Sequence, residues 1–348
     1  MNTTNKKLII ALLVILIFLM CFIPIKSNNS KYKLNIIGPY GDNEAYHPKV
    51  INFPNKWNGY KYWMSYTPYP KGEDSKENPC IAVSNDLVNW ITPNELINPL
   101  YTPEKTEKGK IYNSDSHLVY NSDNNQLECY WRYVNDIEDK IIIYRIVSKD
   151  GINWSEKEVS YEGKNGKSDC ISPAIIYENG IYKMWFVEEI GIIKYAESKN
   201  GLEWNNSQYI TLNYPTNLKT WHLDVIKTKK GYEMLVVAFV NWNKRNDMSL
   251  YYTSSTDGIN WGTATEIIKP AKKTQNWDNK GIYRASFIYE DGIYYVFYGG
   301  TDKNYHHGTG LVFGRDITKL KSTNINYSKP NAGIKFRKLV EKEKNKFK

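Results

Sequence analysis

A seven-residue pattern that begins with serine and ends with tryptophan constrains the fold of this 348-residue chain more than any other feature. Its four copies occupy residues 84–90, 148–154, 198–204 and 255–261, so the tryptophans lie 64, 50 and 57 residues apart. Three copies contain Asp-Gly or Asn-Gly, in which glycine readily adopts the positive φ of a tight turn. The spacing is typical of one propeller blade per copy. Each copy is predicted to end a strand, turn, and return its tryptophan to the sheet.

A second repeat lies upstream of each turn and occurs five times. It places a polar residue ahead of a β-branched or aromatic run, starting at His47, Asp115, Ser172, His222 and Arg284. Aromatic-rich strands follow, and no helical period interrupts them. The repeat predicts an all-β chain of about three visible strands in each of five units. We expect a five-bladed β-propeller, because closing the ring leaves only short, protected edges. Residues 32–37 are expected to supply the outer strand of blade 5, which lacks a Ser…Trp turn.

The N-terminus carries an 18-residue apolar run, residues 8–25, preceded by Lys6 and Lys7. This length and flanking charge predict a transmembrane anchor with the short N-terminus inside. A cleaved signal peptide is the alternative. Either one predicts an extracellular propeller, held at the cell membrane by a single pass or secreted. The expected divisions are an anchor and linker at 1–30, the propeller at 31–330, and a basic tail at 331–348.

The formal net charge of +9 is concentrated at the ends of the chain. Residues 335–348 contribute +5 and Lys6 with Lys7 contribute +2, which leaves only +2 for residues 8–334. The repeats have no basic stripe, so no nucleic-acid partner is expected. The tail is expected to be solvated. Outside the apolar run, Cys80, Cys129 and Cys170 are odd in number, and we predict no structural disulfide.

The polar residues that begin the five repeated strands, which we call the strand heads, indicate where a ligand site lies. The first strand of each propeller blade lines the central channel, with side chains alternating between faces. The heads should therefore meet at one channel mouth and form a ligand pocket. The alternative is that these polar groups satisfy one another and trapped waters. The residues expected to face the pocket are His47, Asp115, His117, His222, Asp224 and Arg284.

A family resemblance rests on the same strand heads and on a motif at the start of the second strands. This motif reads Asn-Gly-Ile-Tyr, ending at Tyr182, and Asp-Gly-Ile-Tyr-Tyr, ending at Tyr295. Here the chain resembles the five-bladed propeller glycoside hydrolases, namely family 43 arabinanases and xylosidases and the related families 32, 62, 68 and 117. Such enzymes carry an Asp at the head of blade 1, an Asp at blade 2 and a Glu at blade 3. Asp115 matches the second position, whereas His47 and Ile171 occupy the other two.

The resemblance implies glycoside hydrolysis, which needs one group to protonate the leaving oxygen and another to activate water or attack carbon. We predict Asp115 and Asp224 as the carboxylates and His47 or His222 as the acid–base partner, since histidine titrates near neutral pH. The residues expected to bind the sugar are His117, Arg284, Tyr46, Trp221, Asp169, Glu188 and His307.

No cofactor is expected, and no catalytic metal, because the sequence holds no close-spaced ligand motif. The alternative is a metal held by His47, His117, His222 and Asp224, which together offer enough nitrogen and oxygen ligands. A structural Ca²⁺ on the propeller axis is the one ion that the resemblance implies. The predicted function is a glycoside-hydrolase-like enzyme that acts on a cell-wall, capsular or exogenous polysaccharide. The alternative is a non-catalytic carbohydrate-binding propeller that has lost the acid and base. The expected partners are a carbohydrate polymer and, through the N-terminal helix, a membrane, and the chain is expected to be a monomer.

Overall fold

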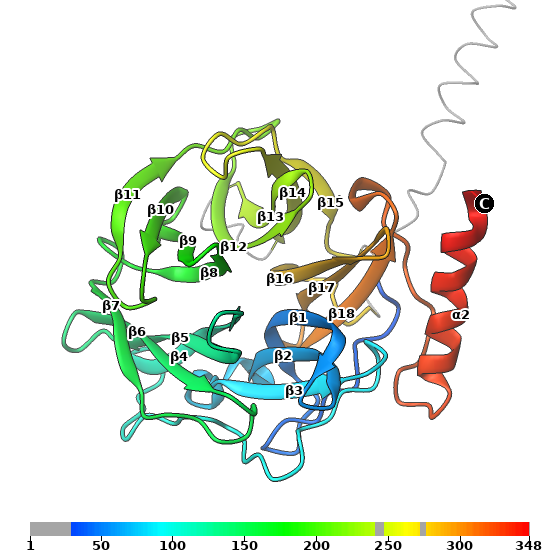
Figure 1. The fold of residues 1–348 in the computed structure, drawn as a ribbon, viewed down its shortest axis with the longest axis horizontal. Helices are drawn as coiled ribbons and strands as arrows, with labels where there is room; N and C mark the ends of the chain where they lie inside the picture. Colours follow the sequence, from blue (N-terminus) through cyan, green and yellow to red (C-terminus); the bar gives the residue numbers. More distant parts are fainter. Residues whose placement is uncertain (1–28, 241–246, 272–275, 348) are drawn as a thin grey trace, which may run out of the picture.

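Five antiparallel sheets surround a central axis in the computed structural model, which describes residues 29–240, 247–271 and 276–347 (Figure 1). The sheets consist, in chain order, of β1 (Ala45–Trp57), β2 (Tyr60–Pro68) and β3 (Cys80–Ser84); β4 (Ile111–Asn121), β5 (Gln126–Asn135), β6 (Lys140–Ser148) and β7 (Glu158–Gly163); β8 (Ile171–Glu178), β9 (Ile181–Glu189), β10 (Ile192–Ser198) and β11 (Asn205–Ile210); β12 (Lys219–Thr228), β13 (Gly231–Phe239), β14 (Ser249–Ser255) and β15 (Thr265–Ile268); and β16 (Gly281–Glu290), β17 (Ile293–Thr301) and β18 (His307–Gly314).

The first strand of each sheet lies nearest the axis, and these strands contact one another around the ring (Figure 1). β16 contacts β1, so blade 5 closes onto blade 1. Five clusters of buried hydrophobic side chains form the core of the ring. The predicted all-β, five-bladed propeller is confirmed.

The serine turns end the third strands of four blades, as predicted, at Ser84, Ser148, Ser198 and Ser255. In blade 2, Ser148 Oγ accepts the backbone N–H of Gly151 at 2.8 Å. Gly151 has a φ of 76°, and a Cβ there would lie 2.2 Å from Trp63 of blade 1. The glycine therefore permits both the turn and the close packing of neighbouring blades. The returning tryptophans are buried in two copies, Trp90 and Trp261, and half-buried in the other two.

The outer edges of the blades differ from the prediction. Blades 2, 3 and 4 have a fourth strand that the sequence analysis did not identify, because these strands are short and mostly exposed. Blade 5 was expected to gain an outer strand from residues 32–37. Leu34 N donates to Thr309 O of β18 at 2.7 Å, but the segment forms no strand. Leu34 and Ile36 instead anchor it by burial in the cluster between blades 5 and 1.

The C-terminal segment forms α2 (Ala332–Lys344), which lies outside the ring beside β17 and β18 (Figure 1). Gly333, Phe336 and Val340 are buried, and the last two join the cluster between blades 5 and 1. The expectation of a solvated tail is therefore wrong for this stretch. Its basic residues conceal an apolar stripe at helical spacing, which packs on the propeller.

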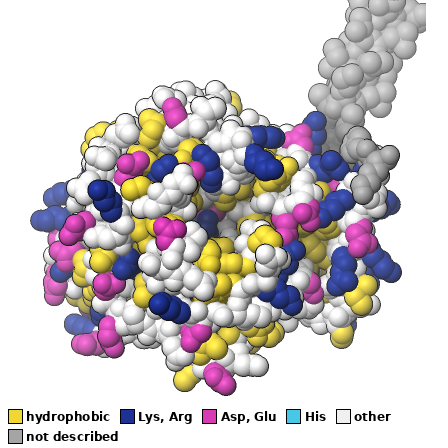
Figure 2. All heavy atoms as spheres, viewed as in Figure 1, with side chains coloured by type: hydrophobic (Ala, Val, Ile, Leu, Met, Phe, Trp, Pro, Cys, Tyr) yellow, Lys and Arg dark blue, Asp and Glu magenta, His cyan; other side chains and the backbone are white. Residues whose placement is uncertain are grey.

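Charges of both signs intermingle over the face of the molecule in Figure 2. This mixture agrees with the small net charge of the repeats. The predicted membrane anchor, residues 8–25, lies outside the described residues. In the part that is described, no helix has the length and apolar character needed to cross a membrane. Cys80, Cys129 and Cys170 are buried free thiols.

Candidate functional site

In blades 1, 2 and 3, the regular pairing between the first and second strands is interrupted at the polar residue that heads the first strand. His47, Asp115 and Ser172 have φ of 50°, 52° and 54°, in the left-handed region that non-glycine residues rarely adopt. Each lies within a register shift between the first and second strands of its blade. Such bulges re-aim side chains and are frequent beside active sites. The local backbone is thus strained where the polar heads converge.

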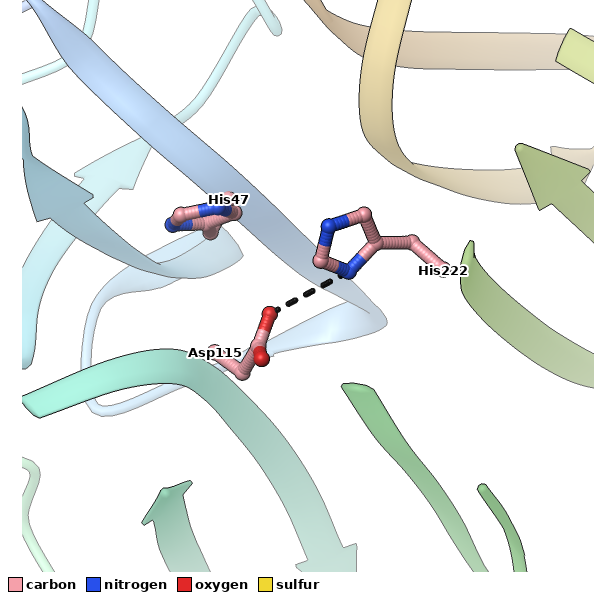
Figure 3. A group of neighbouring side chains, drawn as sticks. All are labelled: His47, Asp115 and His222. Atoms are coloured by element: carbon pink, nitrogen blue, oxygen red, sulfur yellow. Dashed lines mark ion pairs between the residues drawn. The ribbon is translucent and has the colours of Figure 1, made fainter. Parts of the chain in front are cut away.

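His47, Asp115 and His222 lie together although they belong to blades 1, 2 and 4 (Figure 3). One potential ligand atom from each lies within 4.8 Å of the other two, and all three residues are buried. Figure 3 marks the ion pair between His222 Nδ1 and Asp115 Oδ1, which are 3.4 Å apart. We call these three residues the site triad.

Glu77, in the segment between β2 and β3, contacts His47 of the site triad and fixes the orientation of its ring. Its Oε1 lies 2.9 Å from Nδ1 of His47, and Thr67 Oγ1 lies 2.8 Å from the same nitrogen. Nε2 of His47 is then the nitrogen left for a ligand. Burial raises the pKa of Glu77 to about 7, although His47 opposes that shift. The sequence analysis missed Glu77 because its segment occurs in one blade only, so no repeat aligns it.

The surroundings of Asp115 and His222 keep the carboxylate ionised and the imidazole neutral. Burial alone raises the pKa of Asp115, but His222 and Arg284 outweigh it, and the net shift is well below the usual range. Burial lowers the pKa of His222 to about 4, against the pull of Asp115. At neutral pH the carboxylate is therefore ionised and the imidazole is neutral, with a lone pair available.

The site triad faces a cavity of about 470 Å³ at the channel mouth, which we call the site cavity. Three further predicted residues line it. Arg132 Nε donates to Asp169 at 2.7 Å, and Lys194 donates to Glu188 at 2.9 Å, so both carboxylates are already paired. The third predicted residue that lines the site cavity is Trp221. The lining residues that the sequence analysis did not identify include Tyr69, Asp74, Glu77, Tyr112, Arg132 and Tyr283.

The remaining predicted pocket residues do not line the site cavity. Lys49 Nζ donates to Asp224 Oδ1 at 2.7 Å, and His117 Nδ1 lies 4.0 Å from the same oxygen. We call Lys49, His117 and Asp224 the inner layer. Arg284, 1% exposed, lies between the layers: its guanidinium approaches His117 Nδ1 at 3.2 Å and Asp115 Oδ1 at 3.6 Å. The single pocket predicted for all six residues is therefore divided, because the second polar position of each strand points deeper into the channel.

Tyr46 and His307 lie beside the site cavity rather than in it. Tyr46 is buried and stacks on Tyr283, with ring centroids 5.0 Å apart. His307 packs edge-on against Tyr46, with centroids 4.7 Å apart. Both line a second cavity of about 420 Å³. Their predicted contact with a sugar would therefore occur in that neighbouring space.

The site triad has the composition and the free atoms of a metal-binding site. Asp115 Oδ1 and both ring nitrogens of His222 are buried and make no hydrogen bond. Buried polar atoms are normally satisfied, so three such atoms at one point favour a ligand. Two imidazoles and a carboxylate suit a divalent ion such as Zn²⁺. The ligand set considered from the sequence, His47, His117, His222 and Asp224, is thereby corrected, because Asp115 rather than His117 or Asp224 lies beside the two histidines.

Comparison with known proteins finds one curated relative and solved structures that share the fold of this chain. No protein-family model matches the sequence. A curated relative, the A type blood N-acetyl-alpha-D-galactosamine deacetylase of Flavonifractor plautii, is 26% identical over an alignment of 322 residues. That alignment covers 76% of this chain and 41% of the relative, so this chain spans less than half of that protein.

Solved structures share the fold. The crystal structure of an N-acetylgalactosamine deacetylase from F. plautii with blood group B trisaccharide has a TM-score of 0.75 at 22% identity, covering 82% of this chain and 95% of that one. The alpha-L-arabinanase of Cellvibrio cellulosa with arabinohexaose has a TM-score of 0.57 at 14% identity, covering 78% and 91%. The chain therefore has the five-bladed fold that the resemblance to glycoside hydrolases implied.

Proposed function

We propose that this propeller is a carbohydrate-active hydrolase that removes the N-acetyl group from an amino sugar of a glycan. The observation that carries the proposal is the site triad, whose unsatisfied atoms face a cavity of sugar-binding size. The name of the F. plautii relative supports this choice of bond. The predicted substrate, a polysaccharide, is retained, while the predicted glycosidic bond is replaced by an amide.

The division of the channel removes Asp224 from the glycosidase mechanism predicted from sequence. That mechanism paired Asp115 or Asp224 with His47 or His222 across the bond. Asp224 lies in the inner layer and pairs with Lys49, so it does not reach the sugar space. Of the two predicted catalytic carboxylates, only Asp115 lines the site cavity.

Each member of the site has a distinct task in amide hydrolysis. Water adds to the acyl carbon, the C–N bond breaks, a proton moves to the leaving nitrogen, and acetate and the free amine result. A divalent cation held by the site triad would polarise the acyl carbonyl as a Lewis acid. Glu77 fixes the ring of His47 through Nδ1 and, with its pKa of about 7, can hold or release a proton there.

The aromatic walls of the site cavity position the sugar. Trp221 and Tyr283 both line it, and Trp221 Nε1 donates to the Tyr283 hydroxyl at 3.0 Å. This hydrogen bond fixes the two rings relative to each other. Aromatic rings that combine an apolar face with a polar edge suit a pyranose, which has the same two characters.

An extracellular location is part of the proposal, supported by the apolar run at residues 8–25.

The test is product analysis with the full chain. We would treat the protein with a chelator, reload it with Zn²⁺ or Mn²⁺, and incubate it with N-acetylated oligosaccharides. We expect acetate and free amines to appear while the glycan keeps its length, and the chelated protein to be inactive. New reducing ends without acetate would overturn the amide proposal in favour of glycosidic hydrolysis. Tight glycan binding with neither product would favour the non-catalytic alternative.

A further inference from the structure

The second cavity, of about 420 Å³, opens beside the site cavity, and both are lined by Tyr69, Trp221 and Tyr283. We call it the lysine cavity. Its volume lies within the range of about 300–1,000 Å³ that small-molecule sites occupy. A glycan with one sugar in the site cavity can therefore place a neighbouring sugar here. The side chains that distinguish this cavity are Tyr46, Lys71, Lys108, Lys280, Tyr305 and His307.

The two cavities differ sharply in charge. Arg132 is the one lysine or arginine among the described residues that line the site cavity. The carboxylates in that lining are Asp74, Glu77, Asp115, Asp169, Glu188 and Glu189. The lysine cavity has three lysines and, among the described residues, no aspartate or glutamate. A sugar that bridges the two cavities therefore meets opposite fields at its two ends.

The three lysines are available to a ligand. None of Lys71, Lys108 and Lys280 takes part in an ion pair within the described part of the chain. Lys280 Nζ lies 3.0 Å from the centroid of the Tyr305 ring, a contact that holds the ammonium group without neutralising it.

One carboxylate lies beside the lysine cavity but is already engaged. Glu44 Oε2 accepts the backbone N–H of His307 at 2.7 Å and that of Lys71 at 3.1 Å. Burial raises the pKa of Glu44, but the side chain of His307 and these two backbone N–H groups outweigh it and lower the pKa to about 2. Glu44 does not line the cavity. Its charge therefore fixes the cavity wall rather than neutralising the lysine side chains.

We infer that the lysine cavity binds an anionic group, a carboxylate, sulfate or phosphate, on the sugar next to the one that reacts. This inference rests on the proposed function, because it places the reacting amino sugar in the site cavity. Lysines supply mobile positive charges that suit any of these anions, and the tyrosine rings supply a face for the pyranose. The substrate class is then an acidic glycan that contains N-acetylated amino sugars.

The experiment compares matched glycans by calorimetry with the full chain. The probes are a disaccharide of an N-acetylated amino sugar and glucuronic acid, the same disaccharide with its carboxyl reduced to an alcohol, and O-sulfated and O-phosphorylated versions of the reduced sugar. We expect at least one anionic probe to bind about tenfold more tightly than the reduced disaccharide at low salt, and this preference to shrink at high salt. The three anionic probes separate the possible sources of charge.

Two triple variants each remove three positive charges, one at the lysine cavity and the other elsewhere on the surface. A triple variant, Lys71→Gln, Lys108→Gln and Lys280→Gln, should lose the tenfold preference for the anionic probe over the reduced disaccharide. The control is Lys→Gln at Lys199, Lys229 and Lys230, which are exposed, unpaired and line neither cavity. The inference is overturned if all four probes bind alike, or if both triple variants lose the preference equally.

The two proposals fail separately. Lysine-dependent binding of an acidic glycan without acetate release would keep this inference and remove the proposed reaction. Acetate release from neutral and acidic glycans at equal efficiency, unaffected by the triple variant at the lysine cavity, would do the reverse.

Discussion

The site triad and the inner layer arise from the same repeated strand heads, two residues apart, yet they differ in how far their polar atoms are paired. The site triad lines the site cavity and leaves Asp115 Oδ1 and both nitrogens of His222 without hydrogen bonds. In the inner layer, Lys49 pairs with Asp224, whose Oδ2 alone lacks a hydrogen bond, and His117 Nε2 accepts the backbone N–H of Ile175 at 2.9 Å. The comparison teaches that a propeller channel can use one ring of polar residues for chemistry and the next for cohesion.

The largest expected effect is on activity, at the site triad. Asp115→Asn keeps the shape of the side chain and removes its charge, which His222 and Arg284 now stabilise. We expect acetate release to fall by about 10³-fold, within the range of about 10²–10⁴ typical of a positioned catalytic group, with the fold intact by circular dichroism. The matched control is Asp291→Asn, a carboxylate whose side chain is 70% exposed and does not line the site cavity. Comparable activity in both variants would remove Asp115 from the mechanism.

The next effect is on stability, at the inner layer. Lys49→Met leaves the buried Asp224 without its partner, and we expect the free energy of unfolding to fall by about 3–5 kcal/mol. The double variant Lys49→Met/Asp224→Leu should recover most of this loss, since it removes both charges. Denaturant unfolding measures both. The comparison fails if Lys49→Met leaves stability unchanged, or if it abolishes activity in protein that is still folded.

A smaller effect is the pH dependence that Glu77 gives to the metal-free protein. Its pKa rises on folding from 4.5 to about 7, so the folded state holds its proton more tightly than the unfolded state. The stability from this group is fully present below about pH 4.5 and is lost as pH rises to about 7, a change of about 3 kcal/mol. Glu77→Gln should flatten this slope in thermal melts. An unchanged slope would show that Glu77 does not titrate there.

The sequence predicted the fold well because its repeats are local. The serine turns depend on residues within one heptapeptide, and Gly151 shows why the pattern needs glycine. The edges of the blades were less predictable. α2 packs through five buried positions hidden among lysines, and residues 32–37 pack by burial without forming a strand.

The site was predictable as a place but not as an arrangement. Alignment of the heads brought His47, Asp115 and His222 together, because strand position determines height along the axis. The alignment could not show that Asp224 lies deeper in the channel than these three residues, because that position depends on where the bulge in each first strand falls. One signal was overlooked: an aromatic residue precedes the head in three blades, and in blade 5 that residue is Tyr283, a wall of both cavities.

The central claim is that the site triad, and not the inner layer, binds the ligand that makes this propeller an enzyme. The most direct measurement is calorimetric titration of Zn²⁺ or Mn²⁺ into chelator-treated full-length protein, with His222→Ala and His117→Gln as the matched pair. We predict one site per chain in the native protein and in His117→Gln, and none in His222→Ala. Equal metal binding by all three proteins, or loss of binding in His117→Gln alone, would contradict the account.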